Sequence, residues 1–232
     1  MYPDECVQQL LGCKWWIEDE SAKLQRGSLI TACLPQVTQV PWRIVPIGRP
    51  EDPREHGQAT VRIEPFHISS APVGASLPVA VFPGYPGGEF LVLRSKKRPA
   101  VVIATPGNEI PVPLQRGGAK WQYAPTLLVA PYFGAAATES RAGWSPALVE
   151  RIRKCEYPQY VWDILPGHKG EESILRLDHL QPVGDSASSI TIEPFRMSDD
   201  ATRVLDDWLW WYFTGTYDKD GEIAVARSCL LG

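Results

Sequence analysis

The stretch Leu93-Arg-Ser-Lys-Lys-Arg-Pro-Ala-Val-Val-Ile103 carries the clearest sign of the fold in this chain. Three consecutive cations, Lys96, Lys97 and Arg98, lead directly into the apolar run Ala100–Ala104. A short apolar run next to a proline is typical of a buried strand, so we expect the cations on the rim where this strand begins. Cations on that rim are suited to phosphate contacts. The same composition is also typical of a solvated basic turn that flanks a hydrophobic strand, so both interpretations stay open.

Comparable strand-like runs recur along the 232-residue chain, between many of its 22 prolines and 19 glycines. They are Leu29–Leu34, Ala59–Phe66, Glu89–Leu93, Thr126–Ala130, Tyr160–Leu165, Ser173–Asp178 and Ser189–Phe195. Some are apolar throughout and others alternate between apolar and polar residues, as in a small closed sheet. The pattern predicts a mainly β (α+β) fold of many short strands. The Pro- and Arg-rich segment 35–55 is predicted to be a long surface loop or an insertion.

Three segments are predicted to be helical. Apolar residues at helical spacing indicate a first helix over about 4–19. A second helix, over about 146–155, has a proline at its first position, where no N–H donor is needed. The third spans about 199–213, with Ser198 as its N-cap and Gly215 after its last turn.

Composition excludes several classes of protein. With 44% apolar and 10% aromatic residues the chain is not intrinsically disordered, and no apolar run approaches the ~20 residues that span a membrane. The first residues are acidic, which argues against a secretory signal. Five scattered cysteines, without a CxxC pair or histidines at ligand spacing, predict reduced thiols, no metal site and no cofactor in a cytoplasmic protein. The net charge of −4 requires any nucleic-acid site to be a local patch.

A second candidate for chemistry is the run Glu172-Ser-Ile-Leu-Arg-Leu-Asp-His179. Alternation along a strand places Arg176 and Asp178 on one face, and His179 on the opposite face as a structural or exposed residue. A cation beside a carboxylate can act on a phosphodiester, with the carboxylate as general base. The same two residues can also form a plain ion pair worth ~0–1 kcal/mol.

Three segments, in this order along the chain, together resemble the PemK/MazF family of toxin ribonucleases from type II toxin–antitoxin systems. Leu24–Pro35 holds an Arg-Gly, alternating apolar residues and a Leu-Pro, and is similar to the family's opening strand. Leu93–Ile103 is similar to its basic turn, Arg-Pro and apolar strand, and Ser173–Pro182 to its late strand with Arg-x-Asp. The helix over about 199–213 lies where the family has its C-terminal helix.

The resemblance implies a small SH3-like β-barrel with peripheral helices, including the C-terminal one. We therefore expect a single domain over 1–232, with the barrel over 24–213. Residues 1–23 are expected to form an N-terminal helical extension. Residues of about 36–96 are expected to be a long insertion, in the place of a short loop that covers RNA in the family.

The resemblance also implies an activity, the metal-independent cleavage of single-stranded RNA. In that reaction the ribose 2′-OH attacks the adjacent phosphate and leaves a cyclic phosphate and a 5′-OH. Carried over residue by residue, Arg98 matches the family's Arg-Pro arginine and would meet the phosphate charge. Asp178 would be the base for the 2′-OH, and Arg176 would stabilise charge, because an arginine pKa above 12 makes it a poor acid.

Substrate contacts and partners follow from the same resemblance. Lys96 and Lys97 would line the RNA, and Tyr132 lies where the family often has a Thr or Ser near the phosphate. A tyrosine there could stack on a base or belong to the core. A cognate antitoxin and a second copy of the chain would be the protein partners, and no membrane would be involved. The long insertion and the missing hydroxyl residue favour an alternative, a non-catalytic barrel that binds a protein or a nucleic acid.

Overall fold

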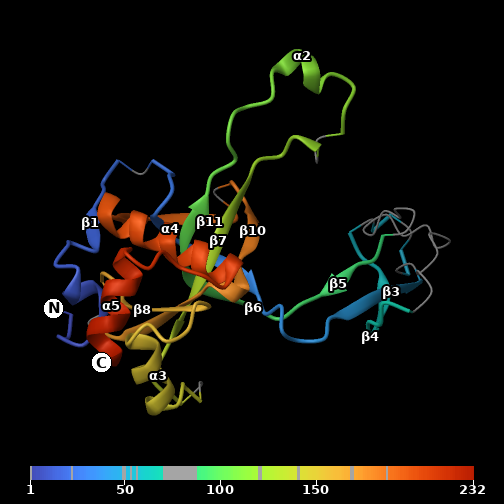
Figure 1. Ribbon diagram of the computed structural model, residues 1–232. Coiled ribbons are helices and arrows are strands. Elements are labelled where there is room, and N and C mark those ends of the chain that lie inside the picture. The colour runs from blue at the N-terminus through green and yellow to red at the C-terminus, as the bar shows by residue number, and fades with distance from the viewer. Residues whose placement is uncertain are drawn as a thin grey trace. The chain divides into compact units, whose positions relative to one another are not determined.

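The computed structural model describes residues 2–21, 23–48, 51–52, 54–55, 57–69, 88–119, 122–139, 142–167, 170–186 and 188–232 (Figure 1). The chain divides into two compact units. The larger unit comprises Met1–Leu34 and Lys97–Gly232, and the smaller one comprises Pro35–Lys96. The smaller unit thus covers the segment that the sequence analysis treats as an insertion. In the described part of the chain, no helix has the length and apolar character needed to cross a membrane.

Strands outnumber helices in the described residues, which confirms the mainly β class. The elements are α1 (Val7–Leu10), β1 (Trp16–Glu18), β2 (Ser28–Pro35), β3 (Trp42–Gly48), β4 (Thr60–Pro65), β5 (Leu91–Val92), β6 (Ser95–Ala104), α2 (Val112–Gln115), β7 (Thr126–Gly134), α3 (Pro146–Arg153), β8 (Tyr160–Ile164), β9 (Glu172–Arg176), the 3₁₀ turn η2 (Leu177–His179), β10 (Gln181–Gly184), β11 (Ile190–Met197), α4 (Asp199–Thr214) and α5 (Glu222–Leu231).

The strands form two sheets. An eight-stranded sheet has the order β1-β11-β2-β6-β7-β9-β8, and β10 pairs with β7 beside this path. Its strands pair in the antiparallel sense and it curls into a half-barrel. A three-stranded sheet, β4-β3-β5, belongs to the smaller unit.

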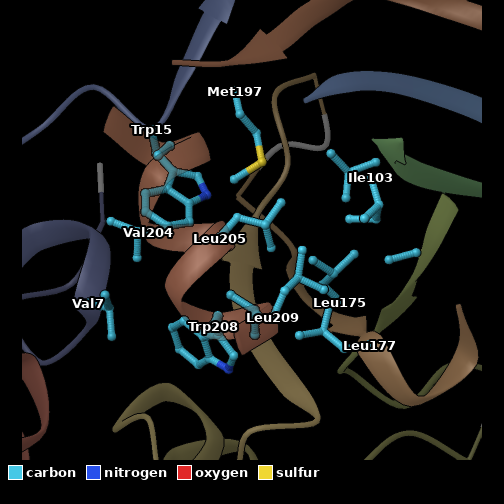
Figure 2. Packing of buried hydrophobic residues seen from close by; sticks show 14 of the residues in the cluster. Val7, Trp15, Ile103, Leu175, Leu177, Met197, Val204, Leu205, Trp208 and Leu209 are labelled. Carbon is cyan, nitrogen blue, oxygen red and sulfur yellow. The ribbon is translucent and has the colours of Figure 1, made fainter. Parts of the chain in front are cut away.

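The large sheet is buried on both faces, which explains the continuous apolar run of β6. On one face, alternate strand residues such as Val101 and Ile103 belong to the same buried cluster as Leu205 and Trp208 of α4. Figure 2 labels Ile103, Leu205 and Trp208 within this cluster. The side chains between these alternate strand residues point the other way. They lie in two further clusters, one with Ile30, Ala100, Val102 and Val129, and one with Ala135, Ile152, Trp162 and Ile174.

Two of the predicted helices are confirmed. Helix α4 begins after Ser198, whose hydroxyl accepts a hydrogen bond from the Ala201 amide at 3.1 Å, and it ends at Gly215 with φ +73°. Helix α3 begins at Pro146, as expected from the proline at its first position. The sequence analysis missed α5, whose buried Ile223 and Ala226 pack on the same core as α4.

The predicted helix over 4–19 is wrong, and so is the helical extension over 1–23. The segment holds only the four-residue helix α1 and then the strand β1. Gly12 has φ +60°, a conformation that breaks the helix. The following Trp15 and Trp16 are both buried, and Trp16 pairs with Met197 of β11. Burial on two faces of an extended chain therefore overrides the helical spacing.

The predicted surface loop over 35–55 is also corrected, because β3 lies within it. β3 pairs with β4 from Trp42 to Gly48, including Pro46 opposite Val61. Its other neighbour, β5, covers only Trp42 and Arg43. The pairing of β3 with β4 shifts in register between Pro46 and Gly48, and such an irregularity is where a sheet tolerates proline.

Candidate functional site

Strand β7 directs two consecutive aromatic residues to opposite faces of the large sheet. Tyr132 pairs with Leu175 of β9, and Phe133 pairs with Ile174. Because side chains alternate along a strand, Phe133 shares its face with Ile174 and Arg176. Tyr132 lies on the face that α4 covers.

Phe133 brings together two of the arginines that the sequence analysis singled out. The guanidinium carbon of Arg98, on β6, lies 4.0 Å from the centroid of the Phe133 ring. The guanidinium carbon of Arg176, on β9, lies 5.5 Å from the same centroid. Both distances are within the range of cation–π attraction. β7 lies between β6 and β9, so one ring joins two cations two strands apart.

Arg176 has further partners on its own side of the sheet. Its guanidinium lies 5.3 Å from the Tyr160 ring and 5.8 Å from the Trp144 ring. Its Nε donates to Asp178 Oδ1 at 2.7 Å, and its Nη2 donates to Asp178 Oδ2. Burial acts to lower the pKa of Arg176, but the hydrogen bonds and charge of Asp178 leave that pKa raised. Arg176 is therefore a permanent cation with a fixed orientation.

Arg176 and Asp178 do not lie on one face of a single strand, as predicted, because a turn follows Arg176. β9 ends at Arg176, and Asp178 belongs to η2. The turn places His179 against Phe133, with ring centroids 5.4 Å apart and an interplanar angle of 82°. The expectation that His179 points to the opposite face is therefore wrong, because side chains alternate between faces only as far as the strand extends. Burial lowers the pKa of His179, and the Arg176 charge lowers it further, which favours the neutral imidazole.

We call Arg98, Phe133, Arg176, Trp144 and Tyr160 the arginine–aromatic strip. Four of its members come from four neighbouring strands, β6, β7, β9 and β8, and Trp144 precedes α3. The side chains of the strip are half-buried, and Trp144 and Tyr160 pack against the cluster that contains Ile152 and Trp162. Sequence reasoning missed Phe133, Trp144 and Tyr160, because nothing in the local pattern marks an aromatic residue whose partner lies on another strand.

The remaining predicted contacts lie outside the strip. Lys96 and Lys97 are exposed at the start of β6. Tyr132 is only 2% exposed, and its hydroxyl donates to Asp163 Oδ2 at 2.9 Å. Its place in the core rules out stacking on a base, so that part of the prediction is corrected.

Asp163 is the centre of a second polar cluster, which sequence reasoning also missed. Its side chain is fully buried and accepts hydrogen bonds from the hydroxyls of Tyr2 and Tyr132 and from Trp16 Nε1, at 2.8, 2.9 and 3.1 Å. Burial raises the pKa of Asp163 to about 6, and these donors lower it only in part. Tyr2 and Trp16 come from the N-terminal segment, so the cluster fastens that segment to β8.

A surface hollow of ~660 Å³ lies beside the connection between β6 and β7. Among its described lining residues, Glu109 carries the charge, and a carboxylate would repel phosphate. In the described part of the chain, no group of three or more His, Cys, Asp or Glu side chains could hold a metal ion.

No family model, curated protein or solved structure matches the chain. The functional proposal therefore rests on the arginine–aromatic strip, with Asp178, and on the sequence resemblance.

Proposed function

We propose that this chain is a metal-independent endoribonuclease of the PemK/MazF type, the toxin of a toxin–antitoxin pair, built on an SH3-like barrel. The observation that carries the proposal is the meeting of Arg98 and Arg176 on one ring, with Asp178 hydrogen-bonded to Arg176. The proposal includes a cytoplasmic location, a cognate antitoxin and a second copy of the chain as partners, all of which rest on the sequence resemblance.

In the proposed reaction Asp178 acts as the base, and Arg98 and Arg176 stabilise negative charge. The Asp178 carboxylate takes the proton of the ribose 2′-OH as the O2′–P bond forms. Arg98 and Arg176 stabilise the charge that builds up on the phosphate oxygens. The P–O5′ bond then breaks, and a proton from water completes the 5′-OH. The products are a 2′,3′-cyclic phosphate and a 5′-OH end, and no redox or metal step is involved.

The geometry of Arg176 leaves room for such a phosphate contact. Asp178 takes the Nε and Nη2 side of the guanidinium. A guanidinium has five N–H donors, so the Nη1 donors stay outside this pair. The ring contacts hold the guanidinium plane, which reduces the side-chain entropy lost when it binds a phosphate.

A specific observation favours a second candidate function, the binding of single-stranded nucleic acid without cleavage. Asp178 is already engaged by both oxygens with Arg176. Two charge-assisted hydrogen bonds must be given up before this carboxylate can turn to a ribose 2′-OH. The strip would then bind RNA through its cations and rings and leave the backbone intact.

The deciding experiment is incubation of the purified protein with a long single-stranded RNA in excess EDTA, with the fragment ends mapped. The proposal expects cuts with 5′-OH ends, slowed at least about 100-fold in Arg98→Ala and in Asp178→Ala. A matched control is Arg203→Ala on α4, which removes an exposed arginine paired with Asp200. Intact RNA at high protein concentration would favour the binding function instead. Wild-type cleavage by either site variant would place the active site elsewhere.

A further inference from the structure

We propose that single-stranded RNA beyond the cleaved phosphate binds along an extension of the arginine–aromatic strip that ends at Tyr157 and Arg151. This inference rests on the proposed function for its ligand, RNA. The Tyr157 ring lies 6.2 Å from the Tyr160 ring, centroid to centroid, at an interplanar angle of 69°. The guanidinium carbon of Arg151 lies 5.0 Å from the Tyr157 centroid. The ring contacts therefore continue from the strip to the last turn of α3.

The extended strip combines cations with aromatic rings. It runs from Arg98 to Phe133, to Arg176, to Tyr160 with Trp144, to Tyr157 and to Arg151. Each step is a contact between rings or between a ring and a guanidinium. Successive bases can stack on aromatic rings or on guanidinium planes, while the guanidinium donors meet phosphates. A single-stranded nucleic acid is the ligand that uses both kinds of group.

Arg151, at one end of the extended strip, and Arg176, within it, present their guanidinium groups in the same way. Arg151 donates through Nε to Glu156 Oε2 at 2.7 Å, and its Nη2 lies 2.7 Å from the same oxygen. Arg176 uses the same two groups toward Asp178. In both residues a carboxylate holds one edge of the guanidinium over a ring, and the Nη1 donors stay outside the pair.

The distal end is open to a ligand and fixed by the scaffold. The Arg151 side chain is 56% exposed, and its backbone belongs to α3. Tyr157 is half-buried and packs against the cluster of Ile152 and Trp162. A rigid ring below an exposed guanidinium is suited to a flanking nucleotide, because little side-chain freedom remains to be lost on binding.

Binding can be measured separately from cleavage with 2′-O-methyl RNA, which lacks the attacking hydroxyl. Fluorescein-labelled probes of three and nine nucleotides would be titrated by anisotropy in EDTA. We expect Arg151→Met and Tyr157→Leu each to weaken binding of the nine-nucleotide probe about tenfold and that of the three-nucleotide probe less than about twofold. Arg151→Met should also reduce the slope of log affinity against log salt by about 0.7. Arg203→Met, which removes an arginine in a similar exposed ion pair, should change neither probe.

Each outcome decides one of the two proposals. Unchanged affinity for the nine-nucleotide probe in both variants, or an equal loss in Arg203→Met, would overturn the extended strip even if the protein cleaves RNA. The expected losses without any RNA cleavage would support the extended strip and leave the protein as a binding module. Displacement of the nine-nucleotide probe by polyglutamate as efficiently as by unlabelled RNA would show that only charge is recognised, and would overturn RNA as the ligand. Far-UV circular dichroism of each variant confirms that the fold is intact.

Discussion

The two faces of strand β7 carry polar clusters that differ in charge and in burial. On one face the hydroxyl of Tyr132 reaches the carboxylate of Asp163, which is fully buried and held by neutral donors. On the other face Phe133 lies between the guanidinium groups of Arg98 and Arg176 at half-exposed positions. Two neighbouring residues of one strand thus lie in different environments, Tyr132 in the core and Phe133 between two arginines.

The difference shows which cluster is available for chemistry. A buried carboxylate without a cation depends on its hydrogen bonds, and each donor left without it would carry a desolvation penalty. The Asp163 cluster therefore serves stability. The arginine–aromatic strip has charged groups, rings and access to solvent, which is the set of features that binding sites require. The predictions below test this division, from the largest expected effect to the smallest.

Removing the buried carboxylate should destabilise the protein most. In Asp163→Ala, the hydroxyls of Tyr2 and Tyr132 and the indole N–H of Trp16 lose their shared acceptor. We expect the free energy of unfolding in urea to fall by about 4 kcal/mol. Asp163→Asn retains one acceptor oxygen and should lose about half as much. Equal stability of Asp163→Ala and the wild type would contradict a structural role for this cluster.

The same carboxylate should make stability depend on pH. Its pKa is about 6 in the folded protein against an ordinary value of 3.8, so the folded state binds the proton more tightly. The stabilisation is present below about pH 4 and is lost as the pH rises through 6, a change of about 3 kcal/mol. The measurement is the difference in unfolding free energy between wild type and Asp163→Asn at pH 4 and pH 7. A difference that is the same at both pH values would refute the raised pKa.

A pair of substitutions at neighbouring positions separates the two faces. Tyr132→Phe removes one donor to Asp163 and should lower the free energy of unfolding by about 1–2 kcal/mol, with no change in RNA affinity. Phe133→Leu keeps an apolar side chain but removes the ring between Arg98 and Arg176, so it should weaken RNA binding by about fivefold. Urea unfolding and anisotropy with the nine-nucleotide probe measure both effects. A loss of RNA affinity in Tyr132→Phe, together with unchanged affinity in Phe133→Leu, would show that the Tyr132 face binds RNA and would contradict this division.

The smallest effect on stability is expected at Asp178. Its side chain is 27% exposed, and an ion pair of that kind contributes ~0–1 kcal/mol. The free energy of unfolding of Asp178→Ala should therefore lie within about 1 kcal/mol of the wild-type value, whereas the proposed function expects its RNA cleavage to be slowed at least about 100-fold. A loss comparable with that of Asp163→Ala would show that the Arg176–Asp178 pair is structural.

Local sequence signals predicted a substantial part of this fold. The apolar runs located β2, β6, β7, β8, β9 and β11, since alternation and short apolar stretches depend on nearby residues alone. The serine before α4 and the glycine after it marked both ends of that helix. The first helix failed because Trp15 and Trp16 have apolar partners far away in the sequence, and helical spacing cannot register them.

The candidate site was predicted in its charged members and missed in its aromatic ones. Arg98, Arg176 and Asp178 were predicted through the resemblance to the Arg-Pro and Arg-x-Asp motifs of the PemK/MazF family. Phe133 and Tyr160 look like ordinary strand residues, and only the register of β7 and β9 shows that one of them lies between the two arginines. Tyr132 was considered for substrate contact because it lies where the family often has a Thr or Ser near the phosphate, and the sequence does not say which face of the strand is covered.

The sequence by itself determined a mainly β chain, the start of α3, both ends of α4, and the charged residues at the starts and ends of buried strands. These features follow from short-range effects, namely periodicity, capping and the conformations of proline and glycine. Only the tertiary structure decided that β7 separates a buried carboxylate from a strip of arginines and rings. Strand order and register depend on contacts between residues far apart in the chain, and a shift of one residue would exchange the two faces.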